Sequence, residues 1–187
     1  MKTSLVQALI SLKFFIVMAI HIMILHACET IPESNRTEDA HIIHNVPFYS
    51  QKKYQCGPSA LASVLNYWGV TVTPEQIEED IFSKDVRGTV TIDMVLYAQK
   101  KGLEAKQYSG NLDMLKKHLD AYHPIIVLVD YGIFTIQINH FLVVIGYSHD
   151  ALIVHSEDTR EQFVTVDEFM KIWKKTDHWT LLITRKT

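Results

Sequence analysis

After the N-terminal region, the two halves of the chain show different patterns of apolar residues. In the first half, apolar residues recur at intervals of three and four residues, the spacing that places side chains on one face of a helix. In the second half they come in short, β-branched runs bounded by polar turns, which is typical of buried strands. Helices followed by antiparallel strands predict an α+β domain.

The clearest helical pattern follows Cys56. Gly57 and Pro58 stand where a helix tolerates them best, at its opening, because the first N–H groups there lack partners anyway. Gly69 supplies the stop. The apolar residues that share one face are Ala60, Leu61, Val64, Leu65 and Trp68. This pattern predicts a helix with Cys56 at or just before its N-terminus.

Further elements follow from capping residues and β-branched runs. Thr73, Pro74 and Gln76 form a capping-box pattern for a helix that ends near Phe82. We expect other helices from Thr91 or Asp93 to Gly102, over 112–122 and over 167–173. We expect strands over 104–108, 125–129, 141–147, 151–155, 162–166 and 178–184.

The N-terminus carries a separate apolar run. Residues 14–25 are apolar except for His21, and so short a run suits the core of a signal peptide better than a membrane span. It ends in Leu25-His26-Ala27-Cys28, which resembles the lipobox of bacterial lipoproteins, although His26 is unusual there. We therefore expect a lipoprotein signal peptide over 1–27, a poorly ordered tether over 28–45 and a domain over 46–187.

Two alternatives remain for this N-terminal region. If residues 5–12 are counted in, the apolar segment is just long enough to cross a bilayer as an uncleaved anchor. Ordinary signal cleavage near Ala27 would instead leave Cys28 as a free thiol. Lipidation gives Cys28 a role, which leaves Cys56 as the only other cysteine to explain.

Composition narrows the possible functions. The 187 residues include only two cysteines, so a disulfide framework is not expected. The net charge of −3 argues against a nucleic-acid binder, which would carry a basic patch. His41, His44 and His140 lack the spacing of a metal-ligand set. We therefore expect no nucleic acid, no metal and no cofactor.

Cys56 and His140 are the candidates for covalent catalysis. The unpaired N–H groups and the macrodipole at a helix start favour a thiolate at Cys56. A nucleophilic cysteine also needs a base within hydrogen-bond reach. His140 opens a strongly apolar strand after a long loop. A lone histidine there is more often structural, but beside a helix-start cysteine it favours a thiolate–imidazolium pair, so we predict that the two are neighbours.

The segments around these residues resemble a known family. They are Val46-Pro-Phe-Tyr-Ser-Gln51, Cys56-Gly-Pro-Ser-Ala-Leu-Ala62 and His140-Phe-Leu-Val-Val-Ile-Gly-Tyr147, and they are similar to bacteriocin-processing, double-glycine peptidases and their papain-like relatives. The resemblance covers residues 46–184 and looks nearest to a stand-alone, lipid-anchored or exported branch. It implies a papain-like cysteine peptidase fold, with N-terminal helices and the cysteine helix packed on an antiparallel sheet that carries the histidine.

The resemblance also implies catalytic roles. Cys56 would be the nucleophile and His140 the general base. In such enzymes a glutamine upstream of the cysteine donates to the oxyanion, and Gln51 is the candidate, with adjacent Gln55 as the weaker alternative. The backbone N–H of Cys56 would be the second donor, since helix-start amides commonly bind anions.

The third catalytic position departs from the family pattern. The family orients its histidine with an aspartate, typically in an Asp-Pro pair, and that position falls on Ser156 here. Asp158 or Glu157 could reach the imidazole if the turn is one or two residues askew. Alternatively, these charged residues form only a solvated turn. A cysteine–histidine pair can work without a third group, because a thiol ionises more easily than a hydroxyl.

Together these features predict a thiol peptidase that hydrolyses peptide bonds on the outer side of the bacterial membrane through a Cys/His dyad or triad. The expected partners are a peptide or protein substrate and the membrane, through a lipid on Cys28. The main alternative is a non-catalytic lipoprotein of the same fold that binds peptides or an envelope partner. Acyl or amide transfer by the same dyad and a cell-wall amidase of related fold are lesser options.

Overall fold

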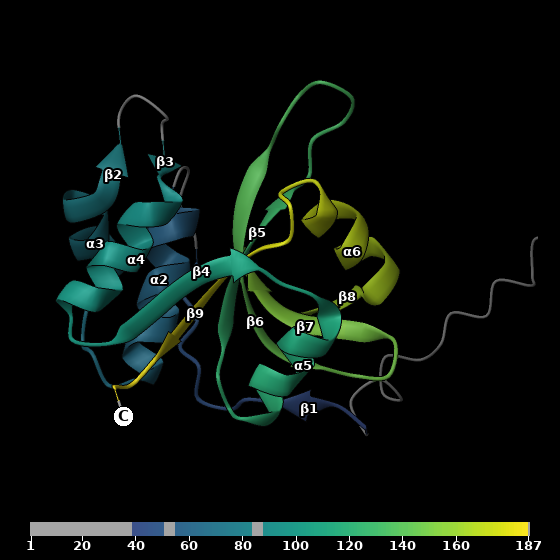
Figure 1. Cartoon of the computed structure of the whole chain (residues 1–187), viewed down its shortest axis with the longest axis horizontal. Helices are drawn as coiled ribbons and strands as arrows, with labels where there is room; N and C mark the ends of the chain where they lie inside the picture. The colour runs from purple at the N-terminus through teal and green to yellow at the C-terminus, as the bar shows by residue number, and fades with distance from the viewer. Residues whose placement is uncertain (1–38, 51–54, 84–87, 187) are drawn as a thin grey trace, which may run out of the picture. The chain divides into compact units, whose positions relative to one another are not determined.

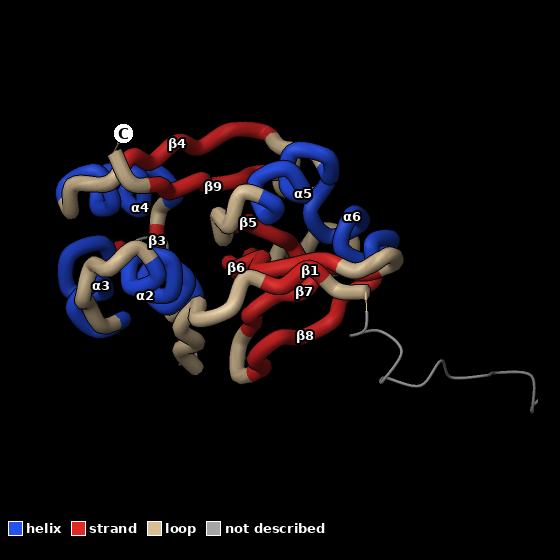
Figure 2. Tube along the Cα trace, turned by 90° about the horizontal axis from the view of Figure 1, so that it is seen from below, coloured by secondary structure: helices blue, strands red, loops and turns tan. Residues whose placement is uncertain are grey.

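The computed structural model describes residues 39–50, 55–83 and 88–186, which fold around an antiparallel sheet (Figure 1). Three helices come first: α2 (Cys56–Tyr67), α3 (Pro74–Ile81) and α4 (Thr91–Lys100). Two more, α5 (Leu112–Asp120) and α6 (Val166–Lys174), alternate with the strands. Helices α2, α3 and α4 gather on one side of the central strands, and α5 and α6 on the other (Figures 1 and 2).

The main sheet has its histidine strand near the middle. Its strands follow the spatial order β4 (Glu104–Ser109), β9 (Trp179–Thr184), β5 (Ile125–Asp130), β6 (Asn139–Tyr147), β7 (Ala151–Ser156) and β8 (Thr159–Thr165). All neighbours are antiparallel. A separate two-stranded ribbon pairs β2 (Phe82–Ser83) with β3 (Gly88–Thr89).

Helix α2 is the centre of the hydrophobic core. Leu61, Val64 and Leu65 are fully buried, and the helix packs against β5 and β6. Burial of each such side chain stabilises the fold by about 1.5–3 kcal/mol. The predicted α+β class, with the cysteine helix packed on an antiparallel sheet that carries the histidine, is confirmed.

Local sequence signals placed most helix starts correctly. Thr73 caps α3, and both hydrogen bonds of the predicted capping box with Gln76 are present. Asn111 caps α5 by accepting from the N–H of Met114. Helix α5 ends at Asp120, two residues before the predicted end, because Tyr122 adopts a left-handed backbone conformation with φ of 58°.

The folded domain reaches further toward the N-terminus than the sequence predicted. β1 (His41–Ile42) pairs with Gly146 and Tyr147 at the C-terminal end of β6. Ile43, the next residue, is buried in the core. These residues fall within the segment that we expected to be a poorly ordered tether. A two-residue strand is too short to show an alternating pattern, so the sequence carried no signal for it.

The predicted signal peptide and Cys28 lie outside the described residues. Within the part of the chain that the structure describes, no helix is both long enough and apolar enough to cross a membrane.

Candidate active site

Cys56 is the first residue of α2, as predicted, and its thiol is largely enclosed. The backbone N–H groups of Phe141, Gly57 and Cys56 itself lie close enough to the sulfur to stabilise a negative charge there. Burial opposes them and is the larger effect, so the pKa of the Cys56 thiol is raised. The negative charge of Glu157 raises it further.

His140 is the second residue of β6, where it pairs with Val129 of β5. Its side chain is partly buried, and burial lowers the pKa of the imidazole. The charge of Glu157 acts in the opposite direction and raises this pKa. Atom Nε2 is buried, and among the described residues it has no hydrogen-bond partner. A buried imidazole nitrogen without a partner is unfavourable unless another group, such as a substrate or water, supplies the missing hydrogen bond.

The backbone brings the Cys56 thiol to the start of β6, the strand that carries His140. The thiol of Cys56 accepts a hydrogen bond from the N–H of Phe141, which directly follows His140 in β6. Glu157, in the turn between β7 and β8, is close enough to influence both ionisable side chains. The start of α2, the start of β6 and the β7–β8 turn therefore converge on one site.

The ionisation of this pair differs from the sequence-based expectation. The helix start was expected to favour a thiolate–imidazolium pair. In the folded protein the pKa of the Cys56 thiol is raised and the pKa of His140 is lowered, in both cases chiefly by burial. Burial of each side chain therefore favours the neutral thiol and the neutral imidazole. Helix-start N–H groups still face the sulfur, but burial outweighs them.

Tyr131 is a residue of this site that the sequence did not reveal. It follows β5, and its ring lies 5.9 Å from the His140 ring, centroid to centroid. Its phenol is hydrogen-bonded to the Ser156 side chain, and burial raises the pKa of Tyr131. The contact arises because β5 and β6 pair antiparallel, which brings the end of one strand beside the start of the next. Only the pairing register, which sequence spacing does not give, could have shown it.

The three candidates for the orienting residue lie in different settings. Ser156 is buried at the end of β7, where its hydroxyl bonds the Tyr131 phenol. Asp158 is exposed and accepts a hydrogen bond of 3.3 Å from the hydroxyl of neighbouring Thr159. Glu157 is also exposed, with a left-handed φ of 45°, and it is the carboxylate whose charge acts on His140. Electrostatics therefore favours Glu157 over Asp158 as the charged neighbour.

The two glutamine candidates for the oxyanion also differ. Gln51 lies outside the described residues. Gln55 is buried, and its side-chain nitrogen donates a 2.5 Å hydrogen bond to Glu78 of α3. That bond holds the Gln55 amide toward α3 and occupies its donor, which argues against the weaker of the two predicted alternatives.

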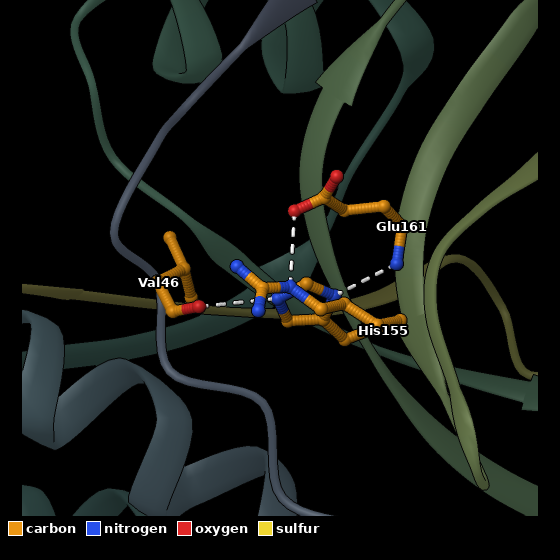
Figure 3. A network of polar contacts seen from close by, with 4 residues as sticks. Val46, His155 and Glu161 are labelled. Atoms are coloured by element: carbon orange, nitrogen blue, oxygen red, sulfur yellow. Dashed lines mark hydrogen bonds and ion pairs between the residues drawn. The ribbon is translucent and has the colours of Figure 1, made fainter.

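A buried histidine fixes the segment that leads into Cys56. Figure 3 shows His155 of β7 between the backbone of Val46 and the backbone of Glu161. The N–H of Glu161 donates to Nδ1 of His155 over 3.2 Å, so the ring proton lies on Nε2, which donates to the Val46 carbonyl over 3.2 Å. Phe48 packs edge-on against the same ring. This histidine therefore ties the Cys56 lead-in to the hairpin that carries Ser156 and Glu157.

Neither this site nor any other group of histidine, cysteine and acidic side chains in the described ranges could hold a metal ion. The arrangement suits covalent catalysis by a thiol: a nucleophile, a nearby imidazole, and backbone N–H groups at a helix start that can stabilise an oxyanion.

Comparison with known structures places the fold. A C39-like protein from Bacillus anthracis has a TM-score of 0.66 at 18% identity, covering 80% of this chain and 100% of its own. The peptidase domain of Streptococcus ComA, a bifunctional ABC transporter involved in quorum sensing, has a TM-score of 0.62 at 23% identity, covering 74% and 97%. A double-glycine-motif protease from an AMS/PCAT transporter, solved with a leader peptide, has a TM-score of 0.61 at 25% identity, covering 75% and 92%.

A curated sequence also matches part of the chain. An uncharacterized protein of Methanothermobacter thermautotrophicus is 37% identical over 81 residues, which is 43% of this chain. The chain spans about half the length (52%) of this relative.

The family comparison covers every element that forms the site. Residues 43–180 match the Peptidase C39-like family, from just after β1 into β9. Together with the structural neighbours, this match confirms the predicted papain-like fold and the predicted resemblance to bacteriocin-processing peptidases at the level of the family. The cysteine helix, the histidine strand and the connecting hairpins all fall within that match. This chain therefore belongs to the Peptidase C39-like family.

Proposed function

We propose that this protein is a thiol peptidase that hydrolyses peptide bonds on the outer side of the membrane, with Cys56 as nucleophile and His140 as general base. The observation that carries the proposal is the contact between the Cys56 thiol and the N–H of Phe141, next to His140. Membership of a peptidase family supports this function independently of the geometry.

The reaction begins from the neutral pair. His140 takes the proton from Cys56 as the sulfur attacks the scissile carbonyl, so the thiolate forms only as it is needed. The imidazolium then gives the proton to the departing amine, which leaves a thioester on Cys56. His140 next activates a water molecule, whose oxygen displaces the thiol and releases the acid product. The lowered pKa of His140 suits its role as a neutral base at the start.

The developing oxyanion needs donors that are in place before the reaction. The N–H of Cys56, at the start of α2, is one proposed donor. Gln51 is the other, as the family resemblance implies. The bond between Gln55 and Glu78 supports Gln51 over Gln55, because it engages the Gln55 amide elsewhere.

Glu157 is the proposed charged partner of His140. A negative charge that raises the pKa of His140 also stabilises the imidazolium that forms during the reaction. Ser156 acts on the ring indirectly, by holding Tyr131 against it. Asp158, whose carboxylate bonds Thr159, is the less favoured orienter.

The proposed location rests on the sequence of the N-terminus. The apolar run over 14–25 and the lipobox-like Leu25-His26-Ala27-Cys28 support export followed by lipid attachment at Cys28. The substrate is a peptide or protein. The leader peptide bound to one structural neighbour supports an extended peptide as the kind of substrate that the site accepts.

Thiol labelling and peptide cleavage together test the catalytic assignment. Iodoacetamide should label Cys56 of the intact protein, and a mixed peptide library analysed by mass spectrometry should show cleavage. Cys56→Ala should abolish both signals. His140→Ala should slow cleavage by about 10²–10⁴-fold, the usual contribution of a general base.

Two control variants match the test variants in residue type. His149→Ala alters an exposed histidine in the turn between β6 and β7, and Cys28→Ser replaces the other cysteine. Both should leave peptide cleavage unchanged. If wild type and Cys56→Ala bind library peptides equally and neither cleaves them, the protein is instead a non-catalytic binding protein.

A further inference from the structure

The loop between β5 and β6 exposes an unusual set of apolar side chains. Ile133 is 68% exposed, Ile136 is 67% exposed, and Phe134 at the tip is fully exposed (103%). No charged residue occurs between Asp130 and His140. The segment also begins and ends with partly exposed hydrophobic side chains, Tyr131 and Ile138. An apolar cluster of this kind on a protein surface usually marks an interaction site.

Hydrogen bonds fix the base of this loop. The carboxylate of Asp130 is buried and accepts hydrogen bonds from the N–H groups of Gly132 (2.7 Å) and Ile138 (2.8 Å). These two bonds keep the pKa of Asp130 below its usual range. Lys175 of α6 donates to the Gly132 carbonyl over 2.7 Å. The apolar tip is therefore held out from the domain by a fixed base, as Figure 1 shows.

We propose that the 131–138 loop is a membrane-contact loop, whose tip enters the apolar part of a lipid bilayer. Ile133, Phe134 and Ile136 would lie among the acyl chains, and nothing in the loop carries a charge that opposes insertion. This inference rests on the membrane location proposed above, but it does not depend on the catalytic role of Cys56.

Charge at the loop base favours a lipid surface as the partner. The last turn of α6 carries Lys171 and Lys174, and Lys175 follows and touches the loop itself. All three lysines are exposed, whereas the acidic residues of α6, Asp167 and Glu168, stand in its first turn. Glu168 lies near Tyr131 at the start of the loop, and Lys175 is the charged side chain that bonds the loop backbone. Lysines beside an apolar tip match the anionic headgroups that lie above the acyl chains.

A second membrane contact also has a physical reason. A single lipid chain gives only marginal, reversible attachment, and stable anchoring takes two signals. The N-terminal chain enters the domain at β1, which pairs with the C-terminal end of β6, whereas the loop leaves from the N-terminal end of β6. The chain entry and the loop are therefore separated by about 27 Å of strand. Insertion of the loop would bring His140, at the loop end of β6, close to the membrane surface.

Tryptophan fluorescence in the full-length chain tests this proposal. Phe134→Trp is reconstituted into vesicles of phosphatidylethanolamine and phosphatidylglycerol with brominated acyl chains, and the emission of the parent protein is subtracted. Bromine quenches only an indole among the acyl chains. Lys117→Trp, at an exposed position of α5 near β1, is the matched control. Quenching at position 134 should be several-fold stronger than at position 117.

A triple variant separates insertion from mere proximity. Adding Ile133→Asp and Ile136→Asp to Phe134→Trp should reduce the quenching to the level of the control, because both changes lie at exposed positions and leave the core intact. Equal quenching at positions 134 and 117 in the single variants would overturn the proposal. The proposal would also be overturned if the emission at position 134 changed with library peptides but not with brominated lipid. The loop would then bind peptides.

Two further readouts keep this inference distinct from the proposed function. Cys56→Ala in the Phe134→Trp background should leave the quenching intact while it abolishes cleavage. If the full-length chain fails to float with the vesicles at all, the membrane location and the membrane-contact loop both fail, whatever the cleavage assay shows.

Discussion

At the scale of single residues, one exposed carboxylate acts on two partly buried side chains. Glu157 raises the pKa of both the Cys56 thiol and His140, in addition to the larger effects of burial. A charge in solvent is screened, so its influence on each group is modest. It opposes ionisation of the thiol but stabilises the imidazolium that follows. The same residue therefore disfavours a resting thiolate and favours the charged base during the reaction.

Neutralising Glu157 should move the pH dependence of thiol reactivity. In Glu157→Gln the pKa of the Cys56 thiol falls, because the negative charge that raises it is gone. The rise of iodoacetamide labelling with pH should therefore occur at lower pH than in wild type, while peptide cleavage slows because the imidazolium loses its counter-charge. Asp158→Asn, in the same turn, is the control and should keep the wild-type labelling profile. Identical profiles for the two variants would show that Glu157 has no special part.

The candidate residues were visible in the sequence to different degrees. Cys56 stood out because Gly57 and Pro58 mark a helix start, which is a local signal. His140 was found only by its place before an apolar strand and by family resemblance. Tyr131 was missed because it meets His140 through the pairing of β5 with β6, a non-local contact. Burial of the thiol is likewise a property of the folded chain, and it raises the pKa of Cys56, which the helix start was expected to lower.

At the scale of elements, the start of α2 depends on close packing against β3. A Cβ added at Gly57 would lie 2.6 Å from the Cβ and from the hydroxyl oxygen of Thr89. No side chain fits in that space without movement of the helix or the strand. Gly57 therefore sets how near the first turn of α2, and with it Cys56, can approach the β2–β3 ribbon.

Gly57→Ala should destabilise the protein and slow the labelling of Cys56. Overpacking of this kind costs about 1–3 kcal/mol, which exceeds the gain of at most about 1 kcal/mol in helix propensity. Adding Thr89→Gly removes the opposing atoms and should recover most of the loss. Unfolding in denaturant, measured for both single variants and the double variant, gives the coupling between the sites. Purely additive effects would mean that the two residues do not meet.

Element prediction succeeded where signals were local. The capping residue Thr73 and the β-branched runs of the second half gave correct element types. β8 begins at Thr159, earlier than the predicted 162, because it is an edge strand whose first residues are all exposed and polar and so show no alternation. The sequence did not predict β1 because this strand depends on pairing with β6, which is a non-local contact.

At the scale of the whole molecule, several histidines contribute to the dependence of stability on pH. Burial lowers the pKa of His118, His123, His140 and His155 below the ordinary value of about 6.5. The unfolded chain therefore binds more protons than the folded chain below that pH. Stability that is present above about pH 6.5 is lost as the pH falls toward the lowered folded-state values.

His155 should account for part of this acid sensitivity. Its Nδ1 accepts from Glu161, so protonation of the ring would break that bond. In His155→Phe the free energy of unfolding should be lower at neutral pH, but it should fall less steeply on acidification. One proton contributes at most about 1.4 kcal/mol per pH unit. Denaturant unfolding across the acidic range measures the slope, and the exposed His149→Ala should retain the wild-type slope. An unchanged slope in His155→Phe would exclude its protonation as a cause.

The short pairing of β1 with β6 has a mechanical consequence. Any pull on the chain that precedes His41 reaches the domain first at this two-residue ladder, at the end of β6 remote from His140. So few hydrogen bonds yield under load before the long β5–β6 and β6–β7 ladders do. If the chain is anchored as proposed, β1 should therefore detach from β6 under load while His140 keeps its place in the sheet.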